Sequence, residues 1–184
     1  MNISIPELEN ILKSEVININ TRVSIDGISI DSRTIGKNEL FIAIKGSNYD
    51  GHLFINDAIK NGASLVISEN LLEDFPCICV DDTTDALINI AKFYADKVNP
   101  LVIGITGTNG KTSVTNMTSM ILRTYKQTLS TYRNYNNQIG LPLSILKGTE
   151  ADEVFVLEMG ASKVGDIKEL VQIAKPTIVA LLNV

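Results

Sequence analysis

The sequence predicts an α/β protein in two parts: a small mixed α/β domain over residues 1–82, then the first part of a parallel-sheet domain over residues 83–184. In the second part, strands that are apolar along their whole length alternate with helical segments, which is typical of a parallel sheet covered on both faces. In the first part, short strands and short helices are mixed. A glycine-rich turn at residues 106–110 joins the first strand of the second part to a helix, which favours a phosphate-binding sheet domain.

Composition narrows the functional classes. Apolar residues make up 45% of the 184 residues and charged residues 20%, which is ordinary for a soluble globular protein. A formal net charge of -5 argues against nucleic acid as the main partner. The first residues lack the basic start and apolar core of a signal peptide, and no run approaches the roughly 20 apolar residues of a membrane span. We therefore expect a cytoplasmic protein that is not inserted in a membrane, with Cys77 and Cys79 as reduced, small apolar residues.

Short elements follow one another in the first part. Ser4 and Glu7 have the spacing of a capping box, so a short helix with one apolar face should follow. A second helix is expected after His52, which we expect to cap it. Apolar runs bounded by turn residues predict strands. The predicted strands are residues 28–33, 39–44, 64–67 and 77–80.

From Thr84 onward, the spacing of apolar residues changes to that of a helix. Apolar residues recur at helical spacing as far as Val98, and Asn99-Pro100 ends the pattern, so the domain junction is placed at this helix or its end. Only three strands of the second sheet are convincing: residues 101–105, 153–158 and 177–182. The first of its two helices is expected to face inward with Val114, Met117 and Ile121. The second is expected to contain Val164, Ile167, Leu170, Val171 and Ala174.

The segment Thr-Gly-Thr-Asn-Gly-Lys-Thr, residues 106–112, has the arrangement of a phosphate-binding loop, with a strand before it and a helix after it. Glycines let the backbone approach phosphate groups, which the N–H groups and the positive end of the helix can then bind. Lys111 would reach the β- and γ-phosphates, and the Thr112 hydroxyl would bind Mg²⁺. The strict pattern requires glycine where this chain has Ile105, and the alternative is a turn with an incidental lysine.

Glu158 ends an apolar strand and is followed by Met159-Gly160. An acid at the carboxyl end of a strand beside the phosphate-loop strand is where such enzymes place a carboxylate for Mg²⁺. With Thr112, Glu158 is therefore a candidate metal ligand, and a strand-terminal surface glutamate is the alternative. Residues 134–142 are dense in amides that could bind a sugar or peptide, although turn formation explains them equally well. Ser32 and Arg33 could bind a diphosphate, with a solvated turn as the commoner explanation.

At these residues the chain resembles the Mur ligases, the ATP-dependent amide-forming enzymes of bacterial cell-wall precursor synthesis. Residues 106–112 are similar to their nucleotide loop, including the departure at Ile105. The segments similar to the amino-terminal domain of two branches of the family, which add the third residue and the final dipeptide, are residues 31–33, 40–46, 50–52 and 61–63.

Two further segments distinguish these branches. Residues 134–142, and Glu158-Met-Gly160 with residues 165–167, resemble the branch that adds D-alanyl-D-alanine. The branch that adds the third residue more typically has a threonine-rich stretch before its proline and serines after its glutamate. It remains an alternative, as does a non-catalytic nucleotide- or UDP-sugar-binding protein.

The resemblance implies a reaction and its cofactors, ATP and Mg²⁺. ATP phosphorylates the terminal carboxylate of UDP-N-acetylmuramoyl-tripeptide, and the amine of D-alanyl-D-alanine then attacks the acyl phosphate, releasing phosphate as the amide forms. Lys111 and Glu158 are the implied catalytic residues, and Thr112 and Glu158 the implied metal ligands. Implied ATP-binding residues are Gly107, Thr108, Asn109, Gly110, Lys111, Thr112 and Ser113; implied substrate-binding residues are Ser32 and Arg33 near the uridine diphosphate, and Asn136 and Asn137 near the muramoyl-peptide.

A complete ligase of this family continues with the rest of its central domain, including a carbamylated lysine at a second metal site, and with a carboxy-terminal domain. We therefore expect this chain to be the front part of a ligase that is a monomer at full length. We expect the 184-residue piece alone to form no UDP-muramoyl-pentapeptide.

Overall fold

The computed structural model describes residues 3–18, 23–46 and 49–183. The chain divides into two compact units, Met1–Ile90 and Ala91–Val184, and the division falls inside helix α3 (Thr83–Val98). Each unit contains a sheet that is wholly or mostly parallel, so the mixed α/β class that the sequence predicts is confirmed. The functional assignment of residues 1–82 and 83–184 stays a prediction. Among the described residues, no helix is both long enough and apolar enough to cross a membrane.

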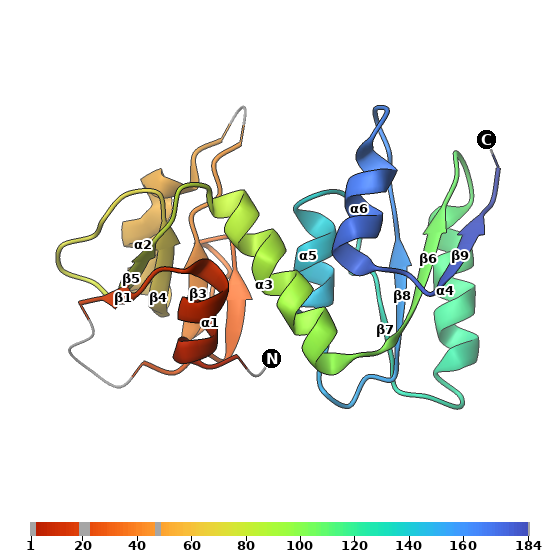
Figure 1. Cartoon of the computed structure of the whole chain (residues 1–184), viewed down its shortest axis with the longest axis horizontal. Helices are drawn as coiled ribbons and strands as arrows, with labels where there is room; N and C mark the ends of the chain where they lie inside the picture. The colour runs from red at the N-terminus through yellow and green to blue at the C-terminus, as the bar shows by residue number, and fades with distance from the viewer. Residues whose placement is uncertain (1–2, 19–22, 47–48, 184) are drawn as a thin grey trace. The chain divides into compact units, whose positions relative to one another are not determined.

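The first unit is built on a five-stranded sheet in the order β1-β5-β4-β3-β2 (Figure 1). Strands β2 to β5 are parallel, and β1 pairs with β5 in the antiparallel sense. Its strands are β1 (Val16–Ile17), β2 (Gly27–Ser29), β3 (Glu39–Ile42), β4 (Ala63–Ser68) and β5 (Cys77–Cys79). Its helices, before α3, are α1 (Ile5–Leu12), the 3-10 helix η1 (Gly51–Phe54) and α2 (Ile55–Asn61).

Local hydrogen bonds decide where these elements begin and end. The predicted capping box is present, since Ser4 Oγ accepts from the Glu7 N–H and the Glu7 carboxylate accepts from the Ser4 N–H at 2.7 Å. The predicted strand 28–33 is too long, because the Asp31 N–H turns back onto Ser29 Oγ at 3.1 Å. Strand β1 was not predicted, because its two residues are too few for a recognisable strand pattern.

Helix α3 has the predicted apolar face and the predicted end. Asp82 Oδ1 accepts from the N–H groups of Thr84 and Asp85 at 2.7 and 2.9 Å, which caps its first turn. Leu87, Ile90, Ala91 and Tyr94 are fully buried. Asn99 takes a left-handed conformation, φ 51°, and Pro100 follows, so the helix cannot continue.

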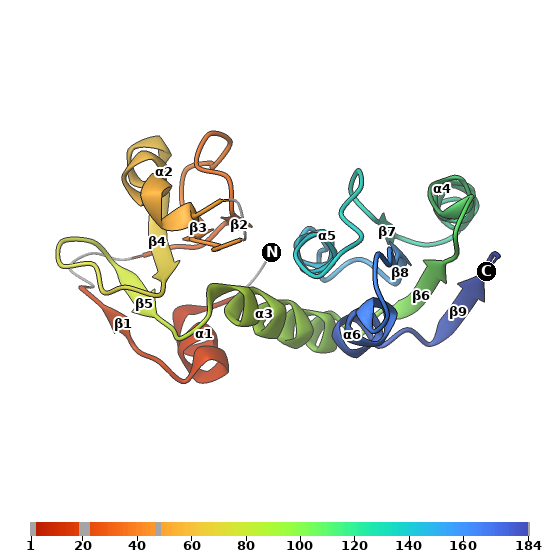
Figure 2. The same ribbon diagram turned by 90° about the horizontal axis from the view of Figure 1, so that it is seen from above.

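The second unit is a four-stranded parallel sheet in the order β7-β8-β6-β9. Figure 2 shows α4 and α6 on opposite faces of this sheet. Its strands are β6 (Leu101–Thr106), β7 (Thr128–Ser130), β8 (Val154–Glu158) and β9 (Ile178–Leu181). Its helices, after α3, are α4 (Lys111–Leu122), α5 (Gly140–Ile145) and α6 (Asp166–Ala174). The three expected strands are confirmed, and β7 is a fourth, whose three residues gave too little pattern to predict.

The inward face of α4 differs from the prediction. Val114 packs on the core of Ile105, Val154 and Val156, as expected. Met117 and Ile121, however, are 63% and 62% exposed. The helix is rotated so that its buried positions are small polar residues, because they allow close approach to the sheet; they are Thr115 and Ser119. In α6, Leu170 and Ala174 are buried, but Val164, which was expected in this helix, precedes it and is fully exposed.

Candidate active site

The glycine-rich loop lies at the carboxyl end of β6, where parallel sheets bind ligands. Gly107 and Gly110 have φ of 143° and 80°, which glycine adopts readily and other residues rarely do. A Cβ atom on Gly107 would also lie 3.1 Å from the Asn183 nitrogen and 3.2 Å from its carbonyl oxygen. The loop thus requires glycine at 107, after the strand, whereas Ile105 is a buried core residue of β6. This explains the departure from the strict pattern.

The end of the loop and the first turn of α4 can bind an anion. Among the described residues, no backbone or side-chain group accepts a hydrogen bond from the N–H groups of residues 110–113, and the first amides of a helix have no partner within it. Lys111 Nζ donates to the Gly107 carbonyl oxygen at 2.7 Å, so the loop itself holds the cation beside these amides. A cavity of about 640 Å³ is lined by Gly107, Thr108 and Lys111 from the loop and by Asn183.

Glu158 lies beside this loop, because β8 pairs with β6 and places Glu158 opposite Ile105. Its carboxylate is buried and accepts from the Thr112 hydroxyl at 2.8 Å and from Asn136 Nδ2 at 2.7 Å. Its own N–H donates to Thr131 Oγ1 at 2.7 Å. The structure therefore brings together the two residues predicted as metal ligands, Thr112 and Glu158.

The donor atoms of this pair suit Mg²⁺. A hydroxyl and a carboxylate oxygen lie 2.8 Å apart beside the amides of the loop. Mg²⁺ prefers oxygen ligands and commonly takes only one or two from protein, with water and phosphate oxygens completing its shell. No group of three or more His, Cys, Asp or Glu side chains that could hold a metal is found in the described part of the chain. Thr112 and Glu158 offer oxygen atoms of the kind that this ion binds, and their role as its ligands stays a prediction.

The amide-rich segment, residues 134–142, holds the carboxylate of Glu158 through a hydrogen bond from Asn136. Asn136 bonds Glu158 through its side chain, and its carbonyl oxygen accepts from the Gly160 N–H at 2.8 Å. Asn137 Oδ1 accepts from the N–H groups of Ile139 and Gly140 at the start of α5. Asn137 therefore has the local turn role that the sequence offered as an alternative, whereas the bond of Asn136 to Glu158 was not predicted. The predicted contact of both amides with the muramoyl-peptide stays a prediction.

Substitution of Gly160 by alanine tests the role of Asn136. A Cβ at this position would lie 2.9 Å from Asn136 Cγ and Oδ1, so the amide must move away from Glu158. Because only a side chain has to move, we expect the free energy of unfolding to fall by less than about 1 kcal/mol. We expect kcat of the full-length enzyme to fall about tenfold or more, the cost of one misplaced charge-assisted hydrogen bond. Steady-state kinetics combined with urea unfolding measures both, and unchanged kcat would assign Asn136 no part in positioning Glu158.

The loop after β8 is fixed to the amide-rich segment. Asp166 accepts from the N–H groups of Ser162 and Lys163, and these two bonds lower the pKa of its carboxyl to about 2. Gln138 Nε2 also donates to Asp166 at 2.9 Å. Since the pKa is lowered by folding, this stabilisation is complete above the ordinary pKa and is lost as the pH falls towards 2.

Ser32 and Arg33 belong to the first unit, which is described by itself. Ser32 is buried, and its carbonyl oxygen accepts from Asn61 Nδ2 at 2.8 Å. The Arg33 guanidinium is exposed and forms two hydrogen bonds to the Asp31 carboxylate, at 2.8 and 2.7 Å. These bonds lower the pKa of Asp31 and raise that of Arg33. Their predicted contact with a uridine diphosphate stays a prediction.

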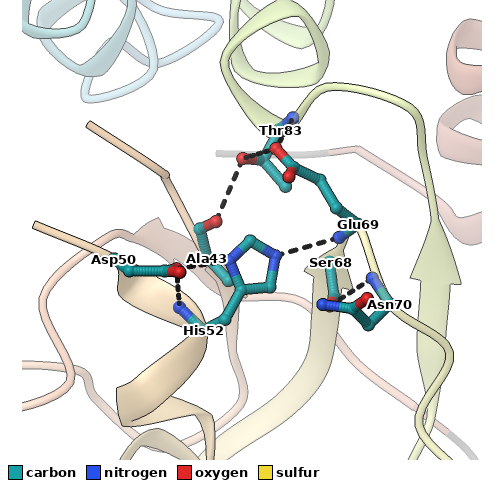
Figure 3. Close-up of polar contacts among 7 residues, drawn as sticks. All are labelled: Ala43, Asp50, His52, Ser68, Glu69, Asn70 and Thr83. Carbon is teal, nitrogen blue, oxygen red and sulfur yellow. Dashed lines mark hydrogen bonds and ion pairs between the residues drawn. The ribbon is translucent and has the colours of Figure 1, made fainter. Parts of the chain in front are cut away.

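His52 has a different role from the expected helix cap (Figure 3). Asp50 caps η1, because its side chain accepts from the His52 N–H at 3.0 Å. The His52 ring lies 2.7 Å from the same carboxylate through Nδ1, and Nε2 accepts from the Glu69 N–H at 3.0 Å. The neutral ring with its proton on Nδ1 satisfies both bonds. His52 therefore links η1 to the end of β4, a long-range contact that no local pattern predicts.

Two family models match the chain: "Mur ligase family, catalytic domain" over residues 24–95 and "Mur ligase middle domain" over residues 105–184. A UDP-N-acetylmuramoyl-tripeptide–D-alanyl-D-alanine ligase of Buchnera aphidicola is 42% identical over 88% of this chain. A UDP-N-acetylmuramoylalanyl-D-glutamyl-2,6-diaminopimelate–D-alanyl-D-alanyl ligase of Acinetobacter baumannii has a solved structure that matches 98% of the chain with a TM-score of 0.91 and 28% identity. A MurF ligase of Thermotoga maritima, solved in complex with ADP, matches 86% with a TM-score of 0.78 and 35% identity.

The chain spans 36% of the length of the Buchnera relative, 41% of the Acinetobacter chain and 37% of the Thermotoga chain. The two family models match separate stretches that together cover most of the sequence, in the order in which the two units occur. The relatives named above match across both units at 28% to 42% identity. The chain belongs to the Mur ligase family.

Proposed function

We propose that this chain is the front part of the ATP-dependent ligase that joins D-alanyl-D-alanine to UDP-N-acetylmuramoyl-tripeptide. The observation that carries the proposal is the pairing of Thr112 with the buried Glu158 beside the phosphate-binding loop. That geometry belongs to phosphoryl transfer. The choice of substrates is supported by the relatives, which are named for this reaction and match across the chain.

The loop would bind the triphosphate of ATP. The unpartnered amides of residues 110–113 would bind phosphate oxygens, with help from the positive end of α4. Lys111 would leave the Gly107 carbonyl and stabilise the negative charge of the transferring phosphoryl group. The ATP-binding residues of the proposal are Gly107, Thr108, Asn109, Gly110, Lys111, Thr112 and Ser113.

Thr112 and Glu158 would hold Mg²⁺, which supplies charge neutralisation to the β- and γ-phosphates when bound. Asn136 keeps one carboxylate oxygen of Glu158 occupied, so that the other faces Thr112. The γ-phosphoryl group would pass from ATP to the terminal carboxylate of the tripeptide, leaving ADP and an acyl phosphate. The amine of D-alanyl-D-alanine would then form the amide as phosphate departs.

The test is an acceptor comparison in the full-length ligase. UDP-N-acetylmuramoyl-tripeptide, Mg²⁺ and ATP are supplied with D-alanyl-D-alanine, and the formation of ADP and of UDP-muramoyl-pentapeptide is measured by chromatography. In a parallel reaction, UDP-N-acetylmuramoyl-dipeptide is supplied with lysine or a diamino acid. We expect product only in the first reaction, in which D-alanyl-D-alanine is supplied. Product only in the parallel reaction would assign the chain to the branch that adds the third residue, and absence of ADP in both would refute a ligase.

A further inference from the structure

Asn183, two residues past the end of β9, forms several hydrogen bonds with the phosphate-binding loop. Its side-chain oxygen, Oδ1, accepts from the Thr108 hydroxyl at 2.8 Å and from the Asn109 N–H at 3.0 Å. Its carbonyl oxygen accepts from the Thr108 N–H at 3.1 Å. Gly107 passes against the Asn183 backbone so closely that a Cβ would be 3.1 Å from its nitrogen. One residue thus satisfies three donors of the loop's first half.

These bonds divide the loop into two halves. The N–H groups of Thr108 and Asn109 already donate to Asn183, so in this arrangement they face Asn183 and not a phosphate. The N–H groups of residues 110–113 have no acceptor in the described part of the chain. We propose that Asn183 is a positioning residue for the nucleotide loop. It holds Thr108 and Asn109 against the end of β9, so that phosphate is bound by the amides from Gly110 onward.

The chemistry of asparagine fits this role. An amide oxygen can accept from a hydroxyl and from an N–H group at once, as it does here, and it brings no charge. A carboxylate at the same position could accept both bonds, but its negative charge would lie beside the phosphates and repel them. Position 183 therefore requires a hydrogen-bond acceptor without charge. Substitutions can test separately the need for an acceptor and the need for neutrality.

The inference rests on the proposed nucleotide function, and its test uses the 184-residue chain with ATP and Mg²⁺. In Asn183→Ala, both side-chain bonds are lost, and we expect the Kd for ATP to rise about tenfold. We expect Thr108→Ala, which removes one donor, to raise it about threefold. The double variant should bind no more weakly than Asn183→Ala alone, because both changes remove the same bond. If the losses of ATP affinity in the two single variants add up in the double variant, the direct contact between Asn183 and Thr108 does not position the loop.

Asn183→Asp separates position from charge. Hydrogen exchange at the Asn109 amide, measured by NMR, should be as slow as in the unsubstituted chain, whereas in Asn183→Ala it should be faster. The Asp variant should nevertheless bind ATP more weakly, and the loss should shrink as salt is added. Ile178→Ala on β9, which is half-exposed and outside the cavity, is the matched control and should change neither quantity.

The two readouts distinguish the two proposals. If the unsubstituted chain binds no ATP but hydrogen exchange at the Asn109 amide depends on Asn183, the nucleotide function fails in this chain. The contact by which Asn183 positions the loop then stands. If Asn109 exchange and the Kd for ATP are both unchanged in Asn183→Ala, the positioning role is overturned while the nucleotide function stands. A fall in thermal stability with unchanged Kd and exchange would reduce Asn183 to a structural residue and also overturn the inference.

Discussion

Replacement of Glu158 by glutamine is expected to lower kcat of the full-length ligase about a thousandfold, at the upper end of what one electrostatic group supplies in a water-excluded site. Glutamine has the size of glutamate but no charge. One of its two terminal atoms becomes an NH₂ donor, which can face the Thr112 hydroxyl only if that hydroxyl turns to accept, and cannot be accepted by Asn136 Nδ2. The substitution therefore removes the charge of the proposed metal ligand and rearranges its buried hydrogen bonds.

The measurement is the rate of ADP formation at saturating ATP and substrates over a range of Mg²⁺ concentrations. Glu153→Gln is the matched control, because Glu153 immediately precedes the same strand, is about half-exposed, and pairs with Lys126 at 2.6 Å. That pairing lowers the pKa of Glu153 and lies far from the loop along β8. A Glu158→Gln enzyme that keeps more than about a tenth of kcat would contradict the assigned role, since a lost metal ligand should cost far more.

Replacement of Gly140 by alanine is expected to lower the free energy of unfolding of the second unit by about 3 kcal/mol, the upper range for forcing atoms into a packed site. A Cβ at this position would lie 2.5 Å from Tyr135 Cα and 2.8 Å from its carbonyl carbon. These are backbone atoms, so the turn before α5 must shift as a whole. Asn136 and Asn137, which follow Tyr135, would shift with it.

Urea unfolding followed by circular dichroism measures this loss. Gly160→Ala provides the comparison, because the three atoms nearest its new Cβ all belong to the movable side chain of Asn136. We expect the Gly140 variant to lose much more stability than the Gly160 variant, although both disturb the same carboxylate. Equal stability losses would mean that the turn before α5 adapts, and the close approach at Gly140 would then not be a constraint on the fold.

Much of the fold and the loop could be predicted from sequence because the relevant signals are local. The strand before residue 106, the glycines and Lys111-Thr112 are neighbours in the chain, and their order alone indicates a phosphate-binding loop. The ends of α1 and α3 were also predictable, since a cap and a helix stop act within a few residues. Strand β7 was not predicted, because three residues are too few to show the alternation of a strand.

The face of α4 shows the limit of periodic patterns. Met117 and Ile121 share a helical stripe with Val114, and hydrophobicity alone placed all three inward. In the structure, Val114 is the one of these three that packs on the sheet core, where Leu122 joins it, and the buried positions of the helix are two small polar residues, Thr115 and Ser119. The rotation of the helix depends on how closely its backbone can approach β6 and β8, which is a property of both surfaces and not of the helix sequence.

The sequence by itself determined the class of the fold and the position of the glycine-rich loop, and it indicated the two proposed metal ligands, Thr112 and Glu158, because each is marked by residues adjacent in the chain or at strand ends. Only the tertiary structure decided which side chains hold these groups in place. Asn136 reaches Glu158, and Asn183 reaches Thr108 and Asn109, across 22 and about 75 positions of sequence. Such bonds arise from the pairing order of β6, β8 and β9, which brings the carboxyl ends of distant strands to one edge.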